Sequence, residues 1–148
     1  MRFHFWHTFF SLFFAALVVV GIAWLSAAGR LAAVIPLADF FLMGLAIFRL
    51  VRLFTYDNIT AFIREWFVGA DARSLLGSLG TLINCPWCTG LWFAFIIVFV
   101  YFATPFAWYV ILILALSAFA SFIQLLANLL GWSAEAKKRE AQGIALPR

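Results

Sequence analysis

Charged side chains are scarce in this chain. Asp, Glu, Lys and Arg together make up 11% of its 148 residues, whereas 67% of the residues are hydrophobic and 20% are aromatic. A soluble domain carries roughly 25% charged residues, so this chain lacks the polar surface that a water-soluble core requires. The shortage of charge excludes a soluble globular domain and predicts an integral membrane protein.

The common enzyme motifs are missing too. The sequence has no phosphate-binding glycine loop, no catalytic triad pattern and no carboxylate pair with the spacing of an acid and a base. It also lacks a nucleic-acid-binding motif, and its net charge of +4 reflects membrane orientation rather than a nucleic-acid partner. We therefore expect no cofactor, no nucleic acid and no conventional enzyme.

Long apolar runs are what the chain does have, and they predict an all-α, polytopic fold. A helix of about 20 residues crosses a hydrocarbon core of about 30 Å. We predict spans over residues 9–28, 85–103 and 106–132, with Thr104 and Pro105 turning the last two into a hairpin. A cleaved signal peptide is the alternative for the first run, but that run exceeds the roughly 7 to 15 residues of a signal core.

A further span is expected over residues 37–56, although it contains Asp39, Arg49 and Arg52. Each of the three lies near a helix end, where a long side chain can reach the interface. Four spans place both termini on one side, and nine of the ten basic residues lie there: Arg2, Arg49, Arg52, Arg64, Arg73, Lys137, Lys138, Arg139 and Arg148. The positive-inside rule makes that side cytoplasmic, so we expect a single integral membrane domain over residues 1–148, with both termini and the tail 133–148 cytoplasmic.

The connection over residues 58–84 is itself half apolar. Its first part has large apolar side chains at helical spacing, namely Ile59, Phe62, Ile63, Trp66 and Phe67. This pattern predicts a short amphipathic helix in the plane of the interface, capped by the side chain of Asp57 or Asn58. Residues 75–84 are too few to span, and we expect them to pack as an interfacial or partly re-entrant segment.

Residues 85–92, "CPWCTGLW", hold the only two cysteines of the chain. Pro86 suits a first helical turn, so Cys85 is expected to be the N-cap, with Cys88 one turn inside. Unpaired N–H groups at a helix start stabilise a thiolate, so the pair is a candidate for disulfide exchange. A reducing cytoplasm and the lack of further cysteines argue against that chemistry.

Two other hypotheses account for the same cysteines. His4 and His7 are expected on the same side of the membrane, so a Cys2His2 zinc site with Cys85 and Cys88 is one of them. In the other, the motif is structural: it starts a helix, Gly90 permits close helix packing, and tryptophans anchor at the headgroups.

A polar stripe marks the last predicted span. Ser117, Ser121, Gln124 and Asn128 recur at helical spacing among Leu, Ile, Phe and Ala. Lipid cannot satisfy amide groups, so the stripe should face protein. Arg49 or Arg52 lies at a similar predicted depth, and one hypothesis is that an arginine there hydrogen-bonds the stripe. The alternative is that both arginines only reach lipid phosphates. At the other end, Asp39 is expected to pair with Arg30.

The segments "LAIFRLVRLFTYDNITAFIREW" and "CPWCTGLWFAFIIVF" resemble a family of small bacterial and phage membrane proteins of unknown function that includes the Bacillus sporulation protein YjcA. The likeness extends from about Leu42 to Leu130. It singles out Arg49, Arg52, Asp57, Arg64, Glu65, Cys85, Cys88, Thr89 and Gly90. It implies no reaction, cofactor or substrate, and it places the first predicted helix outside the shared region.

The sequence thus predicts a membrane scaffold or accessory subunit with a docking surface on the cytoplasmic leaflet. The expected partners are anionic lipid headgroups, another membrane protein or further copies of the chain. A thiol-disulfide oxidoreductase using Cys85 and Cys88 is one alternative function. A phage holin-like pore former is another, suggested by small size, several spans and a charged tail.

Overall fold

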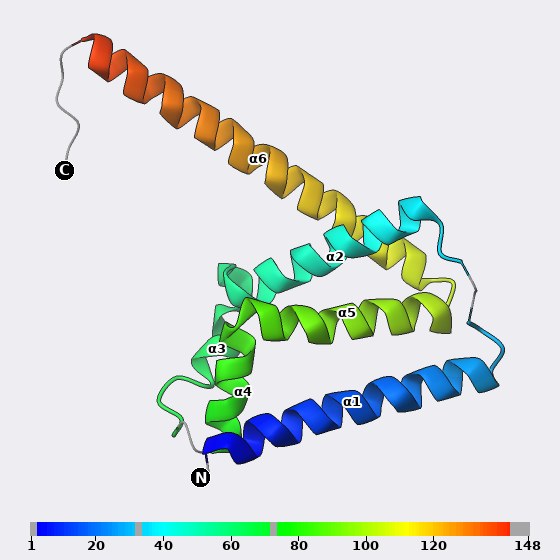
Figure 1. The fold of residues 1–148 in the computed structure, drawn as a ribbon. Coiled ribbons are helices and arrows are strands. Elements are labelled where there is room, and N and C mark those ends of the chain that lie inside the picture. Colours follow the sequence, from blue (N-terminus) through cyan, green and yellow to red (C-terminus); the bar gives the residue numbers. More distant parts are fainter. Residues whose placement is uncertain (1–2, 32–33, 72–73, 143–148) are drawn as a thin grey trace.

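The computed structural model describes residues 3–31, 34–71 and 74–142, except the side chains of Phe3, His4 and His7. Within those residues all regular structure is helical, which confirms the predicted all-α class. The elements are α1 (Phe3–Ala27), α2 (Leu37–Thr55), the 3-10 turn η1 (Asn58–Thr60), α3 (Ala61–Glu65), α4 (Leu75–Asn84), α5 (Pro86–Ala103) and α6 (Ala107–Ala141). Figure 1 shows their arrangement.

Three helices are long and apolar enough to cross a membrane, judged by length and composition. They are α1 over Thr8–Ala27, α5 over Pro86–Ala103 and α6 over Ala107–Ala141. Helix α2 has 19 residues but carries three charged side chains, so its composition does not mark it as a span. The predicted count of four spans is therefore not confirmed.

The long helices pack in layers. Helix α2 lies against both α6 and α5, and α1 packs on α5 (Figure 1). The buried core sits where α2, α5 and α6 meet and consists of Met43, Ala46, Ile97, Ala107 and Ile111. Ala46 and Ala118 are completely buried, because small side chains let helix backbones approach each other closely.

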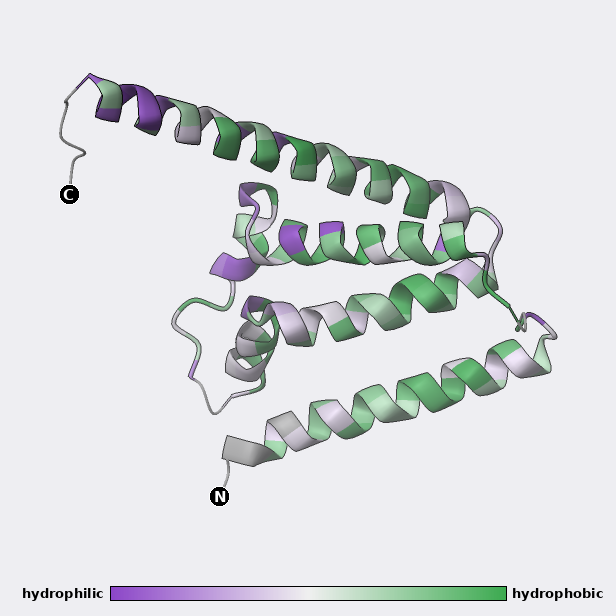
Figure 2. Ribbon diagram, turned by 45° about the horizontal axis from the view of Figure 1, so that its top comes forward, coloured by the Kyte–Doolittle hydropathy of each residue, from purple (hydrophilic) through white to green (hydrophobic). Residues whose placement is uncertain are grey.

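Helix α6 extends well beyond this core. Its 35 residues, at about 1.5 Å each, make it about 52 Å long. Its first part is packed against α2, whereas every residue from Phe122 to Glu135 is exposed, and Figure 1 shows this part leaving the body of the molecule. Figure 2 shows that the extension is apolar at first and hydrophilic near its end. The expected tail, beginning at residue 133, continues this helix as far as Ala141.

Helix ends follow from local sequence. Gly29 adopts a φ of 64° after α1, and the amides of Gly29 and Arg30 donate to the carbonyls of Ser26 and Leu25, each at 3.0 Å. This glycine-based C-cap satisfies carbonyls that have no partner within the helix. Helix α4 begins where the Ser74 hydroxyl accepts a hydrogen bond from the Gly77 amide at 3.0 Å.

The middle connection is less helical than predicted. In the described part of this connection, the helical elements before α4 are η1 and the five-residue α3. The side chains of Ile59, Phe62 and Trp66 are exposed, as an interfacial segment requires. The expected side-chain cap is wrong: neither Asp57 before η1 nor Thr60 before α3 makes a capping hydrogen bond. Asp57 instead forms an ion pair with α2.

Candidate functional site

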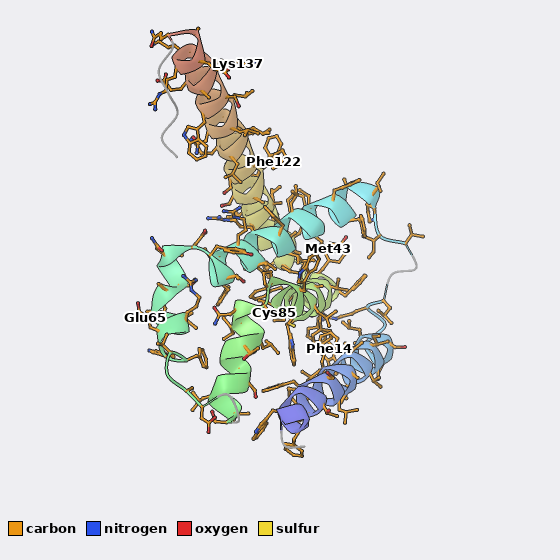
Figure 3. All side chains as sticks on the ribbon, turned by 60° about the vertical axis from the view of Figure 1, so that its left-hand side comes forward. Phe14, Met43, Glu65, Cys85, Phe122 and Lys137 are labelled. Atoms are coloured by element: carbon orange, nitrogen blue, oxygen red, sulfur yellow. The ribbon has the colours of Figure 1, made fainter. Side chains whose placement is uncertain are left out.

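The residues that carry the family resemblance gather at one end of the helix layers. This end comprises the C-terminus of α2, η1, α3 and the corner between α4 and α5 (Figure 3). We call it the polar end. It brings together stretches that are far apart in the sequence, and side-chain hydrogen bonds join them.

Two side chains cap the C-terminus of α2. The Thr60 hydroxyl donates to the Leu53 carbonyl, and the Arg64 guanidinium donates to the Phe54 carbonyl at 2.9 Å and to the Thr60 hydroxyl at 3.1 Å. The last carbonyls of a helix lack partners within the helix, and a cation there also interacts favourably with the helix dipole. Thr60 and Arg64 thus close α2 and fix the direction in which the chain leaves it.

An ion pair holds the same turn. The Arg49 guanidinium lies 3.0 Å from the Asp57 carboxylate, and their side chains are 21% and 27% exposed. The guanidinium of Arg52 lies over the Tyr56 ring at 5.9 Å from the ring centroid. The amides of Tyr56 and Asp57 both donate to the Arg52 carbonyl, at 2.9 and 3.0 Å. Arg49 therefore ties α2 to the chain that follows it.

The α4–α5 corner is built from the "CPWCTG" motif. Cys85 ends α4 and also begins α5, where Pro86 occupies the first turn and the Cys85 sulfur accepts from the Cys88 amide at 3.4 Å. The predicted N-cap is confirmed. The buried Thr89 hydroxyl donates back to the Leu82 carbonyl of α4 at 2.8 Å. No loop residue separates the two helices, so Cys85 and Thr89 together determine the angle of the corner.

Helix α2 also contacts this corner. The Thr55 hydroxyl donates to the Ile83 carbonyl at 3.5 Å. A Cβ at Gly90 would lie 3.5 Å from a methyl of Val51, which is an ordinary van der Waals contact, so glycine is not required there for helix packing. At Gly80 a Cβ would lie 2.8 Å from the Cβ of Phe67, so only glycine lets α4 pack on this side chain.

Both cysteines are free thiols; Cys85 is half-buried and Cys88 is exposed. Hydrogen bonds from the side chain and then the backbone of Cys88 lower the pKa of the Cys85 thiol below its usual value. Cys85 borders a cavity of about 530 Å³, which Asn84, Thr81 and Phe67 also line.

Of the four proposed zinc ligands, the structure describes the side chains of Cys85 and Cys88. The side chains of His4 and His7 lie outside the described residues, so the Cys2His2 site stays a prediction. Among the side chains that the structure does describe, no three His, Cys, Asp or Glu residues gather in a group that would hold a metal ion.

Gln124 and Asn128 lie on the exposed part of α6 and bind each other, with the Gln124 amide nitrogen 3.1 Å from the Asn128 amide oxygen. The hydrogen bond expected from an arginine to this stripe is not among those of the described residues. A cavity of about 460 Å³ instead separates Arg49 and Arg52 from Gln124. The predicted contact between the arginines and the stripe therefore stays a prediction.

Asp39 is at the opposite end, where it binds two aromatic residues rather than Arg30. Its carboxylate accepts from the Tyr101 hydroxyl at 2.5 Å and from the Trp108 indole at 3.2 Å, joining α2 to α5 and α6. Arg30 instead donates to the Ala103 carbonyl. Aromatic donors satisfy the carboxylate while keeping their rings in apolar surroundings.

Sequence reasoning missed Thr55, Thr60, Tyr101 and Trp108. Thr60 offered a signal, because a hydroxyl residue just beyond a predicted helix end is a candidate partner for its last carbonyls. The others act across distant helices, and spacing along the chain gives no indication of such contacts. Glu65, which the resemblance singled out, is exposed on α3, and its side chain makes no hydrogen bond or ion pair among the described residues (Figure 3).

A model of the family described as "Protein of unknown function (DUF1360)" matches residues 42–74 and 70–127. "Sporulation protein YjcA" of Bacillus subtilis (strain 168) is 30% identical over 104 residues, covering 59% of this chain and 88% of the relative. "UPF0713 protein YngL" of the same organism is 35% identical over 77 residues, covering 45% of this chain and 59% of the relative. No solved structure matches the chain. The family match includes the polar end and leaves α1 outside.

Proposed function

On the premise that this chain belongs to the DUF1360 family, a family of unknown function, we propose that it is a membrane scaffold or accessory subunit. In this proposal α1, α2, α5 and α6 span the bacterial cytoplasmic membrane, and both termini are cytoplasmic. The polar end and the extension of α6 form a docking surface on the cytoplasmic side. The role is assembly rather than catalysis.

The position of α2 supports four spans. It packs against both α5 and α6 and supplies Met43 and Ala46 to their shared core, so it shares their depth in any membrane. At about 1.5 Å per residue, Arg49 and Arg52 lie about 9 Å and 5 Å from the end of α2 at Thr55. Arginine side chains at such depths reach the headgroup region.

Charge distribution supports the orientation. Three arginines belong to the polar end, namely Arg49, Arg52 and Arg64. The C-terminal turns of α6 point to the same side (Figure 2) and carry Lys137, Lys138 and Arg139. The opposite end has Arg30 beside the α5–α6 turn. The positive-inside rule then makes the polar end cytoplasmic.

A role in assembly rests above all on the extension of α6. Phe122, Leu129 and Trp132 are 52%, 59% and 74% exposed, and the Gln124–Asn128 pair lies among them. Each amide has hydrogen-bonding capacity beyond this one bond, and acyl chains offer nothing to satisfy it. A transmembrane helix of a partner, or of a second copy, would supply those groups and cover the apolar side chains.

Site-specific photocrosslinking tests this role. A benzophenone amino acid at Leu129 should give one discrete protein adduct in cells, whereas the same probe at Val19 of α1, which is 67% exposed, should give none. Replacing Gln124 and Asn128 by Leu should weaken the Leu129 adduct several-fold. Adducts of equal strength at Leu129 and Val19 would contradict a docking role, and the mass of the adduct distinguishes a second copy from another protein.

One observation favours a second candidate, thiol-disulfide exchange. Cys85 is a helix N-cap with a lowered pKa and borders a cavity, as an attacking thiolate requires. In such a reaction the Cys85 thiolate attacks a substrate disulfide, releases one substrate thiolate and forms a mixed disulfide. The Cys88 thiolate then attacks the Cys85 sulfur and releases the second substrate thiolate, so the substrate is reduced and Cys85 and Cys88 become a disulfide. Cys88→Ser should trap the mixed disulfide at Cys85, and Cys85→Ser serves as the matched control. Failure to trap any adduct under mild oxidation would exclude this activity.

A further inference from the structure

A cavity of about 460 Å³ lies at the fork where the extension of α6 parts from α2. Its two walls differ in chemistry. Three charged residues form one wall, namely Arg49 and Arg52 of α2 and Asp57 just beyond its end. The α6 wall offers Ser121, Gln124 and Leu125. The cavity therefore combines cations, an amide donor and apolar side chains in one place.

The charges that face this cavity do not balance. The Asp57 carboxylate is engaged by Arg49 at 3.0 Å. Arg52 contacts the Tyr56 ring, and no carboxylate in the described part of the chain pairs with it. One positive charge thus remains without an anion. The planar guanidinium of an arginine suits an anionic oxygen ligand, because its fork of donors matches carboxylate and phosphate geometry.

The α6 wall supplies a second donor. One N–H of the Gln124 amide binds Asn128, and the amide nitrogen carries another. The Ser121 hydroxyl already donates to the Ser117 carbonyl at 2.9 Å, so it can only accept. A ligand between the two walls would therefore receive hydrogen bonds from Arg52 on one side and from Gln124 on the other.

In the proposed four-span arrangement the cavity lies near the boundary of the hydrocarbon core. At about 1.5 Å per residue, Arg52 is about 22 Å along α2 from Leu37, and Gln124 is about 26 Å along α6 from Ala107. A hydrocarbon core is about 30 Å thick, so both residues lie near its boundary. Phe122 and Leu125, which are 52% and 44% exposed, provide apolar surface beside the cavity for acyl chains.

We infer that this cavity binds the phosphate of an anionic phospholipid from the cytoplasmic leaflet. Arg52 pairs with the phosphate, the Gln124 amide donates to it, and the acyl chains lie along the exposed face of α6. Basic pockets between membrane helices hold anionic headgroups in this way. The inference rests on the proposed four-span arrangement and assigns a specific ligand to one part of the docking surface.

Lipid retention by the purified full-length protein tests this site. Native mass spectrometry after equilibration with phosphatidylglycerol or phosphatidylcholine should show about tenfold preference for the anionic lipid. Arg52→Gln should remove that preference and Gln124→Leu should reduce it several-fold. Arg139→Gln changes an exposed arginine that pairs with Glu135 at 3.2 Å, and it should retain the preference. An equal loss in Arg139→Gln would show diffuse attraction to basic residues and overturn the inference.

Competition identifies the source of the phosphate. Excess inorganic phosphate should leave the lipid bound, because the acyl chains contribute to binding; displacement would assign the cavity to a free anion and overturn the lipid site. If Arg52→Gln proves unstable, the Gln124→Leu variant tests the same cavity from its other wall. Photocrosslinking at Leu129 does not depend on Arg52, so failure of the lipid site and failure of the docking role give different results.

Discussion

Replacing Thr89 by valine removes one hydroxyl and almost no volume. The Thr89 side chain is 5% exposed, and its hydroxyl donates to the carbonyls of Leu82 at 2.8 Å and Ile83 at 3.3 Å. The Leu82 carbonyl would keep only its hydrogen bond from the Cys85 amide, at 3.2 Å. Losing one net hydrogen bond costs about 0.5–1.5 kcal/mol, which corresponds to about a 2- to 13-fold change in the unfolding equilibrium.

Unfolding of the detergent-solubilised protein measures this cost. Thr81→Val is the matched control, because Thr81 is exposed and its hydroxyl donates within its own helix to the Gly77 carbonyl at 3.0 Å. We expect less than about 0.5 kcal/mol for that control. Thr89→Ser keeps the hydroxyl and should recover most of the stability. Equal losses in the two valine variants would refute the role of Thr89 in holding the corner.

Two further predictions concern the same end of the molecule. Gly80→Ala places a Cβ 2.8 Å from the Cβ of Phe67 and should lower the free energy of unfolding by about 1–3 kcal/mol, while Gly44→Ala, with nothing within 4 Å, should be neutral or stabilising. Similar thermal unfolding of both variants would contradict the tight α4 contact. Because Cys88 lowers the pKa of Cys85, alkylation of Cys85 should begin at lower pH than for an ordinary thiol. Cys88→Ala should move its midpoint upward, and an unchanged midpoint would show that Cys88 does not stabilise the thiolate.

Local sequence rules identified the features that depend on neighbouring residues. Pro86 and Cys85 predicted the start of α5, and the structure has Cys85 as its N-cap. Uncharged runs located α1, α5 and α6. Such features are predictable because each requires only the geometry of one helix and the residues within a turn of its end.

Partners across helices were harder to predict. Asp39 was expected to pair with Arg30, yet Tyr101 and Trp108 bind it, because helix packing brings these aromatic donors to the carboxylate. Asp57 was expected to cap a helix, and the ion pair with Arg49 uses its carboxylate instead. The position of a charged residue in an apolar helix shows that it needs a partner. It does not show which of several candidate residues will lie beside it once the helices pack.

Cys85 is both the C-cap residue of α4 and the N-cap residue of α5, so no linker residues separate the two helices. A hinge needs residues whose backbone angles can change while both helices stay intact, and this junction has none to spare. A change in the tilt of α4 would therefore change the tilt of α5, because the two helices move together. In the proposed membrane arrangement, a movement of α4 at the cytoplasmic surface would therefore be passed along α5 toward the opposite leaflet.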